Sequence, residues 1–244
     1  MNLYREQGVV LRTWKLGEAD RIVVLLTQGE GKVRAVAKGV RKTKSRFGGR
    51  LEPFSHVDLS LYRGRELDIV TQAEVITPFR ALREDYDRVV AGTAMLEAVD
   101  QVAQEREAAL RLYLLLVRAL RALDGGPRDP SVVLDAFLLK LMALEGYRPA
   151  LAECAGCGAS DRPPRCFSIV RGGGLCERCR TGQESTLDAA TMPLLATLLG
   201  DDLDSAAAAA EPAPASRREA GALIKGYVEY HLDRRLRAYP LVAR

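Results

Sequence analysis

Four cysteines in two close pairs constrain the fold of this 244-residue chain more than any other feature. Cys154 and Cys157 are separated by two residues, and Cys176 and Cys179 repeat that spacing after an interval of 18 residues. Two such pairs place four thiolates on two tight turns, which can converge on one Zn²⁺ at about 2.3 Å from each sulfur. A metal with four sulfur ligands has no open position for water, so we predict one structural zinc ion per chain. The fifth cysteine, Cys166, is expected to be an ordinary interior or surface thiol.

The hydropathy of the chain argues against a membrane or secreted protein. The longest stretch without a charged residue, residues 189–200, has 12 residues and includes Pro193, whereas a membrane span needs about 18. Charges at Arg5, Glu6 and Arg12 precede any long apolar run, which argues against a secretory signal peptide. We therefore expect a cytoplasmic protein, in which thiols stay reduced and favour metal binding over disulfides.

Positive charge is concentrated near the N-terminus. Eight lysine and arginine residues fall between positions 31 and 51, with no aspartate or glutamate among them. Clustered cations of this kind are typical of polyanion binding, because they release the counterions that condense on phosphates. The alternative is a solvated loop that aids solubility.

Two aromatic side chains near these cations could stack on a base. Trp14 lies between Arg12 and Lys15 on the expected outer face of a strand, and Phe47 lies within the basic run. For Trp14, the alternative is that it closes one end of a barrel. The predicted nucleic-acid-binding residues are Arg12, Trp14, Lys32, Arg34, Lys38, Arg41, Lys42, Lys44, Arg46 and Arg50.

The first 80 residues alternate between apolar and polar side chains, as strands do. In the last of these segments, Leu67, Ile69, Thr71, Ala73 and Val75 should share one face. The five expected strands cover residues 4–16, 21–27, 32–38, 56–62 and 67–75. Five short strands fit a small barrel, and the OB-fold is the commonest five-stranded barrel that binds nucleic acid. An SH3-like barrel would show much the same periodicity.

After Pro78 the apolar period becomes helical, so we expect an α+β protein of several domains. A capping box at Ser216 and Glu219 should begin the last helix, after an acidic, alanine-rich linker at residues 201–215. The expected helices cover residues 81–102, 105–123, 130–144, 187–199 and 216–239. The predicted domains are a barrel at 1–80, a helical bundle at 81–149, a four-cysteine zinc-binding segment at 150–183, and C-terminal helices at 184–244 that pack on the helical domain.

The sequence contains no recognisable active-site motif. There is no phosphate-binding P-loop motif, and the adjacent carboxylates at Glu84-Asp85 and Asp201-Asp202 are typical of helix starts and linkers. His56 and His231 are expected to be ordinary surface or interface residues. We predict that the chain is not an enzyme.

Several short motifs resemble the bacterial RecO family of recombination mediators. The resemblance is specific over residues 3–76 and weaker through the helices, and it returns at the cysteine pairs. The matching segments are residues 4–11 (YREQGVVL), 17–22 (GEADRI), 31–32 (GK), 38–42 (KGVRK), 44–46 (KSR), 51–54 (LEPF) and 230–232 (YHL). Not all members of that family keep the four cysteines, so the zinc prediction depends on the spacing in this sequence.

The resemblance implies an N-terminal OB-fold, a helical middle and a zinc-bearing segment. It also implies binding of single- and double-stranded DNA, annealing of complementary strands, and help for RecA in replacing single-strand-binding protein (SSB), within the cytoplasmic nucleoid. RecR and the acidic, apolar C-terminal tail of SSB would be partners. Because helix 105–123 offers leucine and tyrosine beside Arg111, Arg118 and Arg121, we predict that these arginines contact that tail. Core packing would explain the same apolar side chains.

Three other functions remain open at this point. An RNA-binding barrel with a zinc ribbon, serving transcription or translation, would share the basic run and the four-cysteine site, and would require the 2′-hydroxyl. An adaptor that binds an acidic protein surface would show no affinity for nucleic acid at moderate salt. A hydrolase with an unrecognised site would show metal-dependent nuclease or nucleotidase activity.

Overall fold

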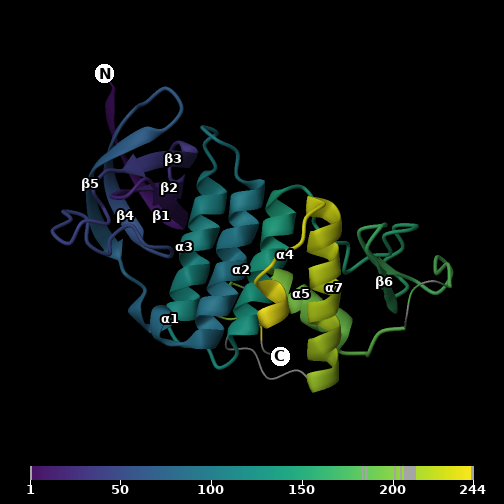
Figure 1. The fold of residues 1–244 in the computed structure, drawn as a ribbon. Helices are drawn as coiled ribbons and strands as arrows, with labels where there is room; N and C mark the ends of the chain where they lie inside the picture. The colour runs from purple at the N-terminus through teal and green to yellow at the C-terminus, as the bar shows by residue number, and fades with distance from the viewer. Residues whose placement is uncertain are drawn as a thin grey trace. The chain divides into compact units, whose positions relative to one another are not determined.

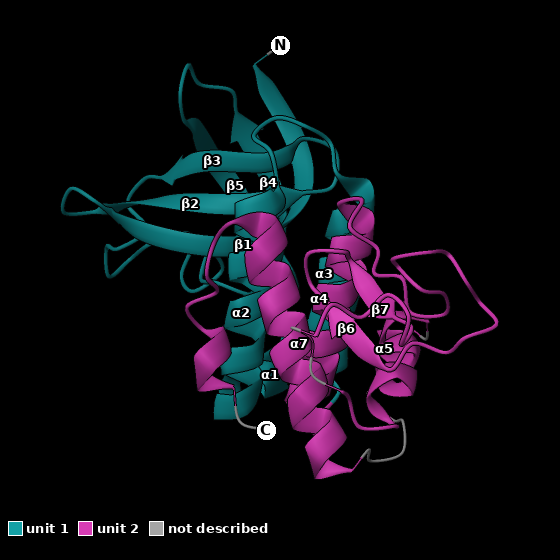
Figure 2. Ribbon diagram, turned by 90° about the vertical axis from the view of Figure 1, so that its right-hand side faces the viewer, with its two compact units in different colours: residues 1–125 teal, residues 126–244 magenta. Residues whose placement is uncertain are grey.

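The chain forms two compact units, which are coloured separately in Figure 2: Met1–Gly125 and Gly126–Arg244. Figure 1 gives the order of the elements in this computed structural model. The structure describes residues 2–182, 184, 186–200, 202–203, 205 and 213–242. Most of the linker that we predict at residues 201–215 therefore lies outside the described residues, as does Asp201. Among the residues described, no helix is long and apolar enough to cross a membrane.

The N-terminal strands close into one barrel. They are β1 (Leu3–Leu16), β2 (Asp20–Thr27), β3 (Gly31–Ala37), β4 (His56–Tyr62) and β5 (Asp68–Thr77). Their order around the barrel is β1-β2-β3-β5-β4, with a parallel pairing of β3 and β5 and antiparallel pairings elsewhere. A five-stranded barrel closed in this order is an OB-fold, which confirms that prediction over the SH3-like alternative.

The side chains predicted to share one face are buried in β3 and in β4. Ala35 and Ala37 of β3 are buried in the same core as Val57 and Leu59 of β4, and Val33 is fully buried as well. The 14-residue strand β1 pairs with β4 along its first half and with β2 along its second. An extra residue in β1 at the bulge between positions 10 and 12 lets one strand serve both partners.

The face that we predict for β5 is wrong over the first half of that strand. Leu61 pairs with Val70 whereas Ser60 pairs with Gln72, so Thr71 is an extra residue in the ladder. The bulge shifts the alternation by one position, and Val70 joins Ala73 in the core. A regular period of two cannot reveal such a shift.

Three helices complete the first unit: α1 (Arg80–Glu84), α2 (Tyr86–Val102) and α3 (Leu110–Asp124). The predicted helix at 81–102 is interrupted at Asp85, whose carboxylate accepts a hydrogen bond from the Arg88 N–H and caps α2. The predicted start of the next helix at residue 105 is also wrong. Residues 104–106 instead run beside β3, where Lys32 N–H donates to the Gln104 carbonyl and Arg106 N–H donates to the Lys32 carbonyl.

The helices of the first unit cover the outer side of β2. Val23 and Leu25 point into the barrel, yet the alternate residues Ile22, Val24 and Leu26 are buried as well. Since α2 packs on β1, and α3 packs on β1 and β2, these three side chains have an apolar cover. The barrel and the first three helices therefore share buried surface.

The second unit contains the cysteine-rich segment and the remaining helices. Among its described residues, the elements are α4 (Pro130–Leu144), β6 (Cys166–Ser168), β7 (Gly173–Leu175), α5 (Thr191–Gly200), α7 (Pro214–Leu232) and a 3₁₀ turn, η1 (Tyr239–Leu241). The start predicted for α4 is confirmed, because Asp129 caps it through the Ser131 N–H and proline follows at the first position.

The predicted capping box of the last helix is wrong. Helix α7 begins at Pro214, and the Ser216 hydroxyl donates to the Asp188 carboxylate at 2.6 Å. The Glu219 carboxylate accepts a hydrogen bond from the Asp188 N–H, so both side chains bind the segment before α5 instead of their own helix start. Helix α7 also ends at Leu232, well before the predicted residue 239. Asp233, the next residue, takes a left-handed conformation.

Candidate nucleic-acid interface and metal centre

The basic loop, residues 38–50 between β3 and β4, is attached to the barrel by buried side chains. Phe47 is 1% exposed and Leu51, just after the loop, is 2% exposed, and both belong to the barrel core. The prediction that Phe47 could stack on a base is therefore wrong, because its ring is inside the protein. The same ring instead fixes the middle of the loop in place.

Backbone hydrogen bonds fix the start of the basic loop against the turn between β1 and β2. The Gly39 N–H donates to the Asp20 carboxylate at 2.7 Å, and the Arg41 N–H donates to the Ala19 carbonyl at 2.9 Å. Gly39 has a φ of 67°, a left-handed conformation that favours glycine. The loop is thus held at both its start and its middle.

Six of the ten predicted binding residues extend from this loop into solvent. They are Lys38, Arg41, Lys42, Lys44, Arg46 and Arg50. None of the six forms an ion pair with any residue that the structure describes. Their charges are therefore available to an external anion.

The other four predicted residues lie together elsewhere, on the outer surface of the barrel. They line a pocket of about 550 Å³. The lining consists of Arg12, Thr13, Trp14, Val24, Lys32, Arg34, Asp100 and Glu105. Trp14 is half-buried in this pocket and is no part of the barrel core, so it does not close a barrel end.

Two carboxylates from the helical part neutralise the cations of this pocket. Arg12 Nε lies 2.8 Å from Asp100 Oδ2, and Lys32 Nζ donates to the Asp100 backbone carbonyl at 2.7 Å. Arg34 lies 3.7 Å from Glu105. The sequence analysis missed both acids, because they lie 68 to 88 residues from their partners and no local pattern marks them.

A buried carboxylate connects the start of β5 to the segment before α3. Asp68 is fully buried and accepts hydrogen bonds from Tyr4 and from Arg106, the latter at 2.7 Å. Burial raises the pKa of Asp68, but the hydrogen bonds from Arg106 and Tyr4 outweigh burial and hold that pKa below its ordinary value. Asp68 therefore stays charged and keeps the barrel attached to residue 106.

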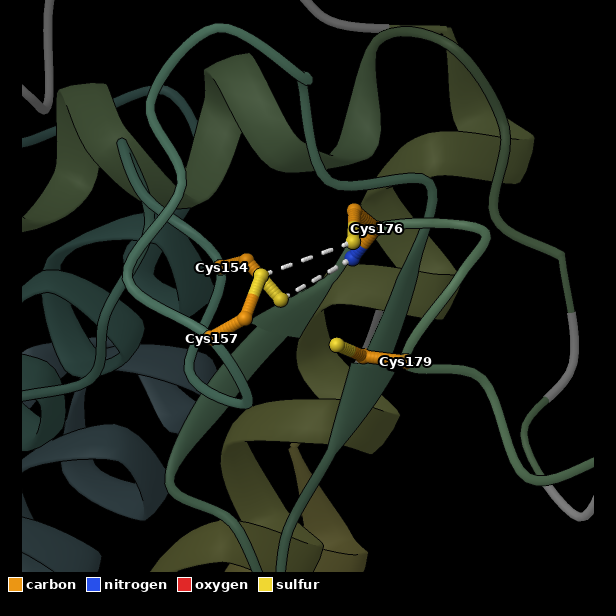
Figure 3. Close-up of side chains that lie close together, drawn as sticks. All are labelled: Cys154, Cys157, Cys176 and Cys179. Atoms are coloured by element: carbon orange, nitrogen blue, oxygen red, sulfur yellow. Dashed lines mark hydrogen bonds between the residues drawn. The ribbon is translucent and has the colours of Figure 1, made fainter.

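The four cysteines of the two pairs come together in the second unit, as Figure 3 shows. Their sulfur atoms all lie within 4.8 Å of one another, and the sulfurs of Cys157 and Cys176 are 3.9 Å apart. A tetrahedral zinc site with bonds of about 2.3 Å requires sulfurs about 3.8 Å apart. These four residues could therefore hold a metal ion.

Backbone N–H groups favour the thiolate form of Cys154. The Cys176 N–H donates to the Cys154 sulfur at 3.3 Å, and this hydrogen bond, together with those from the Gly156 and Cys157 backbones, lowers the pKa of Cys154 to about 6. The neighbouring cysteine side chains instead raise the pKa of Cys179. Gly156 allows the close turn, because a Cβ there would lie 3.1 Å from the Cys179 sulfur. Cys166 lies on β6 with its sulfur 3.7 Å from the Leu175 carbonyl, and burial raises the pKa of its thiol. It is an interior thiol, as predicted.

The two histidines differ in their burial. His56 is 3% exposed and its Nε2 lies 2.7 Å from the Tyr113 hydroxyl, so the prediction of a surface or interface residue is wrong for it. His231 is half-buried and stacks on Tyr147, with ring centroids 4.5 Å apart. Alternation places Val57 inside the barrel and His56 on the opposite, outer face of β4, where Tyr113 of α3 lies against it.

The three arginines predicted to contact a partner are exposed on α3. Arg111, Arg118 and Arg121 share one side of the helix with Leu114, which is 41% exposed. Most of the other apolar side chains of α3 are buried. Core packing therefore uses much of the apolar surface that the predicted contact requires, and Leu110 and Leu114 remain exposed.

Comparison with known proteins identifies the family. The model for the N-terminal part of recombination protein O matches residues 1–79, and the model for its C-terminal part matches residues 83–240. The chain is 49% identical to a relative from Nocardioides, over 99% of this chain and all of the relative. It is 49% identical to a relative from Frankia casuarinae and 48% identical to one from Thermobifida fusca, each over the full length of both chains. All three relatives are named DNA repair protein RecO, a name that states no catalytic activity. The chain therefore belongs to the RecO family of DNA repair proteins.

Proposed function

We propose that this RecO family member binds single- and double-stranded DNA, anneals complementary strands, and helps RecA to replace SSB on DNA at the nucleoid. It would do so without catalysing a reaction. The observation that carries the proposal is the basic loop, which presents six exposed cations on a backbone fixed by Phe47 and by the Gly39 and Arg41 hydrogen bonds.

Annealing requires two strands to approach although their phosphates repel each other. Cations on an exposed loop can neutralise both backbones at once, and the counterions released from the phosphates favour the complex. Base pairing then supplies the specificity. Since the loop offers lysine and arginine to the backbone rather than groups aimed at groove edges, we expect little sequence preference.

The four cysteines would hold zinc, which supplies structural cross-linking of the cysteine-rich segment and no reactive position. Cys154, Cys157, Cys176 and Cys179 provide the four thiolates that fill a tetrahedral site. Strands β6 and β7, of three residues each, would gain most from that cross-link.

Two protein partners belong to the proposal: RecR and the C-terminal tail of SSB. An acidic, apolar tail requires an apolar surface beside cations, and α3 offers Leu110 and Leu114 next to Arg111. Arg111→Glu together with Arg118→Glu should weaken binding of a tail peptide. Unchanged peptide affinity in that double variant would remove α3 from the proposal.

The test is annealing of complementary DNA strands coated with SSB, with no nucleotide added. The loop variant replaces Arg41, Lys42, Lys44 and Arg46 with Glu. A matched control replaces Arg80, Arg218, Arg234 and Arg237 with Glu, four exposed arginines outside the loop that carry the same total charge. We expect the natural protein and the control variant to anneal, and the loop variant to lose annealing.

Other outcomes would favour other functions. Tight binding to bare strands without annealing would leave only a binding module, and a requirement for the 2′-hydroxyl would favour RNA. Loss of annealing in the control variant as well would mean that net charge, rather than the basic loop, determines the activity. No nucleic-acid binding at moderate salt would favour an adaptor for an acidic protein surface.

A further inference from the structure

We propose that Asp100 is a positioning residue, which holds Arg12 over the Trp14 ring and thereby weakens single-strand binding in the barrel pocket. Release of Arg12 would uncover Trp14 for stacking on a base and free a cation for phosphate. This inference rests on the proposed DNA binding. In the structure as it stands, the Asp100 carboxylate keeps Arg12 over Trp14 and so keeps the stacking surface covered.

The contacts of Arg12 carry the argument. Its guanidinium lies 5.1 Å from the centre of the Trp14 ring, and its Nε lies 2.8 Å from Asp100 Oδ2. A base cannot stack on the ring face that a guanidinium already occupies. Arg12 is 59% exposed, so it can leave this position at small cost.

Asp100 still lies beside a second cation, Lys32, when Arg12 leaves. Lys32 is only 15% exposed, donates to the Asp100 backbone carbonyl at 2.7 Å, and lies 3.6 Å from Asp100 Oδ1. Asp100 lies near the C-terminus of α2, where the helix dipole disfavours a carboxylate that has no cation beside it. Because Lys32 stays, exchanging the Asp100 carboxylate for a DNA phosphate on Arg12 leaves no uncompensated charge.

The pocket has the size for a nucleotide. Its volume of about 550 Å³ falls within the range of ordinary ligand sites, and Arg34 lies at its wall, 3.7 Å from Glu105. Arg34 is 39% exposed and can exchange that carboxylate for phosphate in the same way. One base on Trp14 and adjacent phosphates on Arg12 and Arg34 would fit this arrangement.

The chain supplies its own reporter, since Trp14 is the only tryptophan. The experiment titrates an oligothymidylate strand into the full-length protein and follows tryptophan fluorescence, with acrylamide quenching of the free protein as a second readout. For Asp100→Asn we expect about two- to fivefold tighter binding at moderate salt and stronger acrylamide quenching. The matched control is Asp87→Asn, which makes the same charge change in the first turn of α2, about 20 Å away along the helix.

A second variant separates release of Arg12 from a general change in charge. Arg12→Gln should also increase acrylamide quenching, and Asp100→Asn should bring no further gain in affinity in that background. Equal gains in the Asp87→Asn control, or a gain by Asp100→Asn that persists without Arg12, would overturn the proposal. If Asp100→Asn fails to fold, unchanged acrylamide quenching in Arg12→Gln alone would overturn it. No binding by the natural protein would instead refute the proposed function.

Discussion

His56 is a buried base whose environment disfavours its charged form. Burial lowers its pKa to about 4, and the nearby Arg121 adds to that shift. Its Nε2 contacts the Tyr113 hydroxyl, whereas Nδ1 is buried and has no hydrogen-bond partner among the described residues. The protonated ring carries an N–H at both nitrogens, and the N–H at Nδ1 would have no acceptor among the described groups.

This environment predicts a stability that depends on pH. The unfolded chain protonates His56 near pH 6.5, but the folded protein does so only near pH 4. The contribution of a neutral His56 is thus complete above about pH 6.5 and is lost progressively as the pH falls toward 4, by about 3 kcal/mol in all. Urea unfolding across this range should show the loss in the natural protein and a smaller loss in His56→Gln. Equal pH dependence in both proteins would contradict the assignment.

The structure gives Phe47 a different role from the one that its sequence neighbours suggest. Within a run of cations it is a candidate stacking residue, but the fold buries it in the barrel. Phe47→Ala should therefore lower the free energy of unfolding by about 3–5 kcal/mol, as measured by urea denaturation. Arg46→Ala, which removes the guanidinium 4.8 Å from the same ring, should cost at most about 1 kcal/mol. A Phe47→Ala protein of unchanged stability would contradict this role.

At the scale of elements, the cysteine-rich segment has little structure of its own to stabilise it. Strands β6 and β7 pair over three residues each, and much of the apolar cluster around them is cysteine. A segment this small cannot bury enough apolar surface to order its backbone, so a metal cross-link should supply much of its stability.

We therefore expect one zinc ion per chain in washed protein, by metal analysis. Cys176→Ser should lose the metal and become rapidly cleaved by trypsin at Arg171 or Arg178. Cys166→Ser, the matched control, should keep both the metal and the resistance to trypsin, because Cys166 lies outside the cluster. Metal-free natural protein would refute the zinc prediction.

Helix boundaries also depend on packing at this scale. The sequence from residue 105 onward is apolar enough for a helix, yet residues 104–106 hydrogen-bond to β3 and α3 begins only at Leu110. Gly31 makes this approach possible, because a Cβ at that position would lie 1.8 Å from the Glu107 carbonyl oxygen. Helical periodicity contains no information about such a neighbour, so it cannot predict the true start.

At the scale of the whole molecule, the barrel that we predict at residues 1–80 shares buried surface with helices beyond it. A fragment of residues 1–80 would expose Ile22, Val24 and Leu26, at about 1.5–3 kcal/mol each. We expect residues 1–125 to unfold cooperatively in urea and residues 1–80 to aggregate or unfold without cooperativity. Equally cooperative unfolding of the shorter fragment would support an independent barrel domain.

The distribution of charge over the molecule predicts how the proposed DNA binding should depend on salt. If the basic loop supplies about four to six phosphate contacts, the logarithm of the affinity for single strands should fall with the logarithm of salt at a slope of about −3 to −4. The variant with Glu at positions 41, 42, 44 and 46 should have a slope of about −1, measured by fluorescence anisotropy. A slope near zero in the natural protein would contradict an electrostatic interface.

The features that the sequence by itself determined are those set by near neighbours in the chain. Alternation marked the barrel strands, cysteine spacing marked the four-cysteine cluster, and the run of cations marked the basic loop, because each depends on a period or spacing of a few residues. Tertiary structure decided the inward turn of Phe47, the shifted register at Thr71, and the pairing of Arg12 with Asp100. These features arise where distant segments pack against each other, and no local pattern encodes which charges will meet.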